Sequence, residues 1–64
     1  MPDLYTLLMP FHGRTYVYIM EETTGDLLIS GYLDKMDYTE YDLCPVKTAE
    51  VYNNHITVYI EQPY

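Results

Sequence analysis

The C-terminal part of the chain contains the pattern that most constrains its fold. From Ile56 onward, aliphatic residues alternate with polar or aromatic ones in the run Ile-Thr-Val-Tyr-Ile. A period of two is typical of a β-strand that turns one face toward a core. The run follows Asn53-Asn54, and asparagine tolerates the left-handed backbone of a two-residue hairpin turn. The pattern therefore predicts a hairpin between residues 47–52 and 55–60.

The side chains specify the register of this hairpin. The facing pairs are Tyr52 with His55, Val51 with Ile56, Glu50 with Thr57, Ala49 with Val58 and Thr48 with Tyr59. Aliphatic residues meet on one face, and a shift of one residue would destroy this agreement. The alternative is a short helix over residues 47–53, because Lys, Ala and Glu favour helices.

A second hairpin is predicted between residues 14–22 and 26–33. Its first half is rich in β-branched and aromatic residues, and Gly25 suits the left-handed position of a three-residue loop. The expected pairs are Met20 with Leu28, Ile19 with Ile29, Tyr18 with Ser30, Val17 with Gly31 and Tyr16 with Tyr32.

Two further segments complete the expected fold. Residues 4–11 are predicted to form an edge strand that pairs with residues 14–21, since Pro10 cannot donate a ladder hydrogen bond. Residues 34–45 form either an acidic loop or one short helix near residues 34–43, capped by Asp34. The sum is a mainly β fold of about five antiparallel strands in one domain over residues 1–64. A curved meander and a C-terminal hairpin would make an open sheet or a small barrel.

The alternation divides the side chains between two faces. The predicted core contains Leu8, Val17, Ile19, Leu27, Ile29, Ala49, Val51, Ile56, Val58 and Ile60. The opposite face gathers Tyr16, Tyr18, Met20, Tyr32, Tyr52 and Tyr59. So many aromatic side chains on one solvated face are typical of an interface. The sheet could curl into a barrel, in which case some of these tyrosines would belong to its core or rim. Alternatively, the face could pair with a second copy in a homodimer or stack nucleic-acid bases.

The size of the chain favours a partner subunit. A chain of 64 residues is marginally stable alone, and small scaffolds usually need a staple. The only cysteine, Cys44, cannot form an intrachain disulfide, and one cysteine with two histidines cannot complete the usual zinc site. We therefore expect a homodimer, with a stable monomer as the alternative, and no metal or cofactor.

The charge constrains the choice of partner. Ten carboxylates face three basic residues, Arg14, Lys35 and Lys47, for a formal net charge of −7. Such a surface disfavours direct contact with nucleic-acid phosphates or anionic lipid and favours basic proteins. Solubility alone is the simpler explanation of the charge. Short apolar runs, a start without a signal-peptide pattern and a lone thiol favour a cytoplasmic protein without a membrane span.

No residue pattern predicts an enzyme. Ser30 lacks the Gly-x-Ser-x-Gly elbow. Carboxylates near Cys44 should raise its pKa, so it is expected to be a small buried hydrophobe. His12 precedes Gly13 and suits a turn, while His55 is placed to stack on Tyr52.

The densest local feature is acidic. The residues predicted to bind a partner are Asp34, Asp37, Tyr38, Glu40, Tyr41 and Asp42. A rigid array of carboxylates can occupy a groove that was built for phosphates. The first hypothesis is thus a non-enzymatic acidic module that inhibits a nucleic-acid-processing protein through its basic surface. Phage or mobile-element inhibitors of the anti-restriction or anti-CRISPR type have this general character.

Two other functions remain open at this point. One is a binder of single-stranded nucleic acid, or a nuclease-like accessory, that uses the tyrosine-lined face with Arg14 and Lys47. The other is a structural subunit whose exposed face is covered by a different chain.

Overall fold

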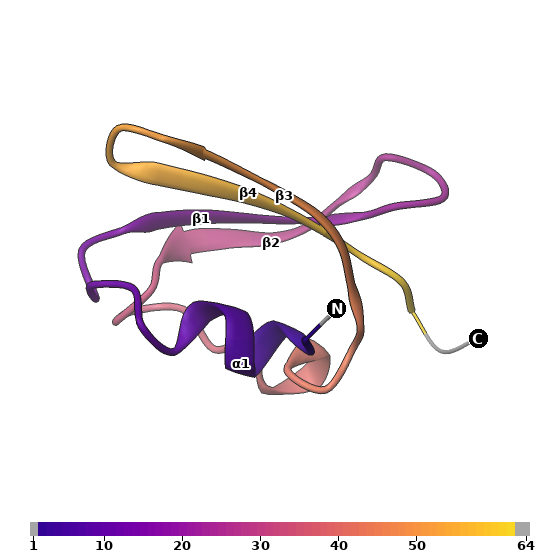
Figure 1. Cartoon of the computed structure of the whole chain (residues 1–64), viewed down its shortest axis with the longest axis horizontal. Helices are drawn as coiled ribbons and strands as arrows, with labels where there is room; N and C mark the ends of the chain where they lie inside the picture. The colour runs from indigo at the N-terminus through magenta and orange to yellow at the C-terminus, as the bar shows by residue number, and fades with distance from the viewer. Residues whose placement is uncertain (1, 63–64) are drawn as a thin grey trace.

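The computed structural model describes residues 2–62. Its elements are the helix α1 (Leu4–Leu8), strands β1 (Tyr16–Glu21) and β2 (Leu27–Tyr32), the 3-10 helix η1 (Thr39–Tyr41), and strands β3 (Val46–Tyr52) and β4 (His55–Ile60). The four strands form one open sheet in the order β2-β1-β4-β3. Figure 1 shows the sheet edge-on, with α1 and η1 on one side of it. The mainly β fold is confirmed, as an open sheet and not a barrel.

The C-terminal hairpin has the predicted register. All five expected pairs between β3 and β4 are present, from Tyr52 opposite His55 to Thr48 opposite Tyr59. Asn53 has a φ of 30°, which agrees with a left-handed turn residue. The strand begins one residue earlier than expected, because Val46 pairs with Ile60 across a bulge at Lys47.

The hairpin of β1 and β2 follows the prediction except at its turn. Tyr16 to Ile19 pair as expected, but Met20 lies opposite Leu27 instead of Leu28 because of a bulge. Gly25 has a φ of 76° and supplies the left-handed position. The bulge turns Leu28 toward the core, while Leu27 remains 53% exposed. The assignment of Leu27 to the core was therefore wrong, since one extra residue reverses the face.

The centre of the sheet differs from the prediction. β1 and β4 are parallel, with Tyr16 opposite His55 and Glu21 opposite Ile60. The sheet is therefore mixed and has four strands, where about five antiparallel strands were expected. The parallel pair is possible because β2, η1 and β3 form a long connection between its strands.

The expected first strand is a helix. Asp3 accepts a hydrogen bond from the backbone N–H of Thr6 at 2.8 Å, as a helix N-cap does. Leu4 and Leu8 lie four residues apart, and both are fully buried. This spacing matches a helical face better than a strand. The prediction of a strand over residues 4–11 was wrong because it gave weight to Pro10 and passed over the cap.

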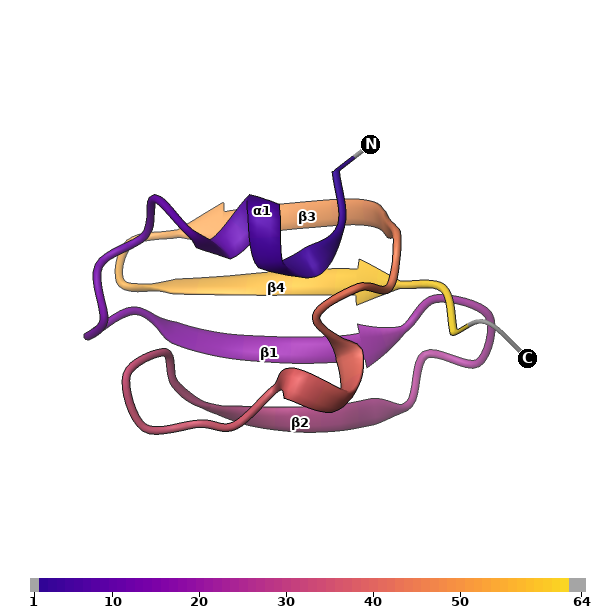
Figure 2. The ribbon, with the colours of Figure 1, turned by 90° about the horizontal axis from the view of Figure 1, so that it is seen from below.

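Residues 33–45 connect the two hairpins and cross the same face of the sheet as α1. Figure 2 shows α1 alongside β3 and β4, and η1 over the β1 and β2 side. Two hydrogen bonds join the connection to α1, from the N–H of Leu4 to Cys44 O at 3.0 Å and from that of Tyr5 to Asp42 O at 2.9 Å. The predicted short helix is thus one 3-10 turn within an ordered segment.

The core lies between the sheet and this helical layer. Its buried members are Leu4, Leu8, Val17, Ile19, Cys44, Val46, Ile56, Val58 and Ile60. Cys44 is a buried hydrophobe, as expected. Ile29 and Ala49 are half-buried against this core. Val51 was also assigned to the core, but it is 61% exposed because it lies on the edge strand β3.

The described residues contain no helix with the length and apolar character needed to cross a membrane.

Candidate functional site

A row of aromatic rings crosses the sheet on the face opposite α1. Tyr32 pairs with Tyr16, Tyr16 pairs with His55, and His55 pairs with Tyr52. These four residues, here called the aromatic row, come from β2, β1, β4 and β3 in that order. They lie at one level of the sheet because both hairpins and the parallel pair share this register. The strands therefore place four rings side by side at the end where β1 and β4 begin.

Ring contacts connect this row through Tyr18. The Tyr16 ring lies 5.0 Å from that of Tyr32, at 82°, and 5.0 Å from that of Tyr18. Tyr18 meets the edge of His55 at 5.9 Å, and His55 stacks on Tyr52 at 5.4 Å. These distances are within the range of favourable aromatic pairs. The expected stacking of His55 on Tyr52 is confirmed.

The aromatic row is partly open to solvent. Tyr32 and Tyr52 are both 52% exposed. Figure 1 shows no described segment above this face. Met20 and Tyr59 pair with each other further along β1 and β4, so they lie apart from the row. The six residues assigned to an aromatic face thus divide into a cluster of four tyrosines and a separate pair.

A shallow hollow of about 680 Å³ lies beside the row. The aromatic and basic residues that line it are His12, Arg14, Tyr16, Tyr18, Tyr32 and His55. Asn53 and Asn54 add two side-chain amides from the β3–β4 turn. Among the residues that the structure describes, no carboxylate lines this aromatic hollow.

The turn that carries Arg14 is fixed by hydrogen bonds. The Arg14 N–H donates to His12 Nδ1 at 3.0 Å, which confirms the turn role expected of His12. The Thr15 N–H donates to His12 O at 3.0 Å, and the Asp34 N–H donates to Gly13 O at 2.9 Å. A Cβ at Gly13 would come within 2.9 Å of Asp34 Cβ, so this close approach requires glycine. The rigid turn holds Arg14 at the edge of the hollow.

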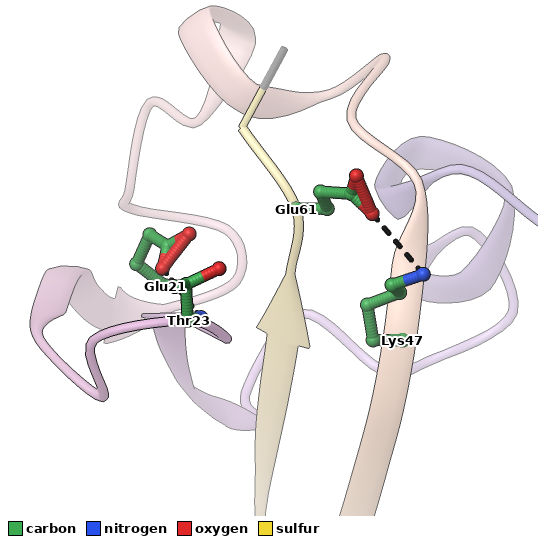
Figure 3. A network of polar contacts seen from close by, with 4 residues as sticks. All are labelled: Glu21, Thr23, Lys47 and Glu61. Atoms are coloured by element: carbon green, nitrogen blue, oxygen red, sulfur yellow. Dashed lines mark hydrogen bonds and ion pairs between the residues drawn. The ribbon is translucent and has the colours of Figure 1, made fainter. Parts of the chain in front are cut away.

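Lys47 lies at the other end of the sheet. Its Nζ atom forms an ion pair with Glu61 Oε2, drawn as a dashed line in Figure 3, at a distance of 3.1 Å. Nearby, Glu21 accepts a hydrogen bond from the Thr23 N–H at 2.6 Å. Lys47 and Arg14, which the nucleic-acid hypothesis used together, are therefore not brought together.

The acidic residues extend from the Gly13 turn, where the Asp34 N–H donates to Gly13 O, to the 3-10 helix η1 that contains Glu40. Asp34, Asp37 and Glu40 are exposed, whereas Asp42 is half-buried. The Thr39 hydroxyl donates to Asp37 at 2.6 Å and the Thr39 N–H donates at 3.1 Å. These two bonds, the hydroxyl first, lower the pKa of Asp37. The carboxylate thus stabilises the turn that precedes η1.

The two tyrosines of the acidic segment face inward. Tyr38 and Tyr41 are half-buried and pack against the core. Burial raises the pKa of the Tyr38 hydroxyl, and the nearby Tyr5 and Asp42 raise it further. These side chains hold the segment on the protein and present only part of their surface to a partner.

The surroundings of Cys44 determine how readily its thiol ionises. Burial, and then the charge of Asp42, raises the pKa of the Cys44 thiol, which opposes formation of a nucleophilic thiolate. Within residues 2–62, no three His, Cys, Asp or Glu side chains come together as a metal site.

Glu50 accepts a hydrogen bond from the Tyr52 hydroxyl at 3.2 Å, and its charge raises the pKa of that hydroxyl.

Sequence reasoning identified the tyrosines but missed the hollow. The four tyrosines share a face because of alternation, which is visible in the sequence. Arg14 and His55 come together only through the parallel pairing of β1 and β4, for which the sequence offers no local signal.

Comparison of the chain with known proteins gave no match to a protein-family model, to a curated protein or to a solved structure.

Proposed function

We propose that this chain is a non-enzymatic binding module that engages the basic surface of another protein through residues 34–42. The observation that carries the proposal is the combination of exposed carboxylates and an ordered backbone in this segment. Asp34, Asp37 and Glu40 are exposed. Among the described residues, no basic group lies within 4.0 Å of these carboxylates. They are therefore free to meet cationic groups of a partner.

Hydrogen bonds preorganise the acidic segment. The Tyr41 N–H donates to Tyr38 O at 2.8 Å, and the Cys44 N–H donates to Tyr41 O at 3.0 Å. Together with the Tyr5–Asp42 bond to α1, these contacts fix the spacing of the carboxylates. A preorganised surface loses less conformational entropy on binding than a mobile loop does.

The partner class follows from the charge. Arginine and lysine clusters that bind phosphates also bind carboxylates of suitable spacing. A nucleic-acid-processing protein presents such clusters, so occupation of its groove would inhibit it. This is the mode of action expected of a small inhibitor encoded by a phage or mobile element. A reducing compartment such as the cytoplasm suits the lone thiol of Cys44.

An inhibition assay with a charge-reversed variant tests this proposal. The probes are a purified restriction endonuclease, an RNA-guided nuclease and a DNA polymerase, each assayed for activity at low and at high salt. We expect the wild-type chain to inhibit at least one of them, more strongly at low salt. The variant D34K/E40K should lose this inhibition because it presents positive charge to a basic groove.

The matched control is E22K/D26K, which changes the net charge equally at the β1–β2 turn. It should retain most of the inhibition. The proposal is contradicted if none of the three enzymes is inhibited, or if both variants lose inhibition equally. Circular dichroism verifies that the variants are folded.

A further inference from the structure

The aromatic hollow has a local charge opposite to that of the whole chain. The chain has a formal net charge of −7, yet the ionisable groups that line the hollow are Arg14, two histidines and tyrosines. Within the described residues, Arg14 forms no ion pair. A guanidinium without an ion-pair partner beside exposed rings is suited to bind the phosphate or carboxylate of a ligand.

The size and polarity of the hollow restrict its ligand. A volume of about 680 Å³ falls within the range of roughly 300–1,000 Å³ that is usual for small-molecule sites. Tyr16, Tyr18 and Tyr32 offer ring surfaces for stacking. The amides of Asn53 and Asn54 can donate and accept hydrogen bonds at the edge of a heterocycle.

From these features we propose that the aromatic hollow binds a single nucleotide, with its base against the tyrosines and its phosphate at Arg14. The nucleotide is either free or at the end of a single strand. Stacking on tyrosine is available to every base, and the guanidinium matches phosphate geometry. The rest of the surface is acidic and repels a longer phosphate backbone. Affinity should therefore not increase as a strand is lengthened.

This site and the acidic segment proposed above have different lining residues, and they meet where Asp34 contacts Gly13 beside Arg14. The aromatic row lies on the face of the sheet that α1 and η1 leave uncovered, as Figures 1 and 2 show. The inference therefore goes beyond the proposed function and does not depend on it. A second copy of this chain is the competing occupant of the same face.

Binding of defined nucleotides at low ionic strength tests the proposal. The probes are adenosine monophosphate, adenosine and a labelled oligothymidylate of about eight nucleotides, measured by calorimetry or fluorescence anisotropy. We expect the mononucleotide to bind more tightly than the nucleoside. Equal affinity for the mononucleotide and the oligomer would show that the site also accepts a strand end, and weaker binding of the oligomer would identify the free nucleotide as ligand. Tighter binding of the oligomer would contradict a site for one nucleotide.

Two variants with matched controls locate the site. Tyr32→Ala should weaken binding by about 5- to 150-fold, the range of one stacked base. Its control is Tyr5→Ala, because Tyr5 on α1 has the same 52% exposure and lies away from the hollow. Arg14→Ala should weaken mononucleotide binding about tenfold and leave adenosine binding nearly unchanged. Its control is Lys47→Ala, which removes the same charge at the other end of the sheet.

Three other outcomes would overturn the proposal. The first is that neither the mononucleotide nor the oligomer binds at low ionic strength. The second is that Tyr5→Ala or Lys47→Ala weakens binding as much as its counterpart in the hollow. The third is a concentration-dependent dimer, detected by sedimentation, that Tyr32→Ala dissociates and that nucleotides do not affect.

Discussion

At the scale of single residues, short-range hydrogen bonds fix the turns of this protein. Asp3 caps α1 through the Thr6 N–H, and Glu21 accepts hydrogen bonds from two N–H groups of the β1–β2 turn, at 2.6 Å and 3.0 Å. The backbone hydrogen bond from Thr6, and then its side-chain hydrogen bond, lower the pKa of Asp3 below its usual value of 3.8. Charged acceptors of this kind stabilise a helix start more than neutral ones do.

The lowered pKa of Asp3 predicts how stability depends on pH. A carboxyl whose pKa is lower in the folded state stabilises the fold above its unfolded pKa of about 3.8. This contribution is lost as the pH falls through the folded pKa. Asp3→Ala should therefore have a lower melting temperature than wild type at neutral pH, and the difference should shrink in acid. Thermal unfolding between about pH 7 and pH 2.5 measures this.

The control for this experiment is Asp3→Asn. Asparagine can also cap a helix but cannot ionise there. It should retain most of the stability, and its difference from Asp3→Ala should stay nearly constant with pH. A constant difference between wild type and Asp3→Ala would contradict the assigned role of the charge.

At the scale of elements, α1 depends on the contacts that it makes with the rest of the chain. Five residues are too few for a helix to persist alone in water. Leu4 and Leu8 are fully buried, and two backbone hydrogen bonds connect the helix to Cys44 and Asp42. Packing and these bonds thus supply the stability that helix propensity does not.

A pair of leucine variants tests the docking of α1. Leu4→Ala should lower the free energy of unfolding by about 2–5 kcal/mol, because it leaves a cavity under the sheet. Leu43→Ala removes the same atoms from a side chain that is 79% exposed and should change it by less than about 0.5 kcal/mol. Urea denaturation of both variants gives the values. Equal effects would show that α1 does not pack through Leu4.

These elements also show what sequence reasoning could reach. Both hairpins were predicted almost to the residue, because alternation and turn residues such as Asn53 are local signals. The strand predicted over residues 4–11 failed because a short apolar run fits both periods, and here Asp3 and the tertiary contacts favour a helix. The parallel pairing of β1 with β4 joins segments far apart in the chain, so no local pattern reports it. The aromatic hollow depends on that pairing and was missed for the same reason.

At the scale of the whole molecule, a small core supports a strongly charged surface. One ion pair within the described residues, between Lys47 and Glu61, offsets little of the formal charge of −7. Exposed pairs of this kind contribute at most about 1 kcal/mol. Mutual repulsion of the carboxylates should therefore weaken the fold.

Salt should stabilise this protein. Raising sodium chloride from about 0.01 M to 0.15 M shortens the screening length from roughly 30 Å to 8 Å and so reduces the repulsion. We expect the melting temperature to rise by several degrees. The variant E22Q/D26N removes two negative charges and so takes the net charge from −7 to −5. Its melting temperature at low salt should be higher than that of the wild type and should rise less when salt is added. A melting temperature that falls with added salt would contradict this view of the surface.

The position of β4 between β1 and β3 has a consequence for how the protein is made. Synthesis proceeds from the N-terminus, so β4, one of the two central strands, leaves the ribosome after the other three strands. Until then one edge of β1 is unpaired and β3 has no partner, and unpaired strand edges are prone to aggregation. Only the β1–β2 hairpin can form early, and a lone hairpin is marginally stable in water. The sheet therefore assembles in one late, cooperative step, after His55–Ile60 has emerged.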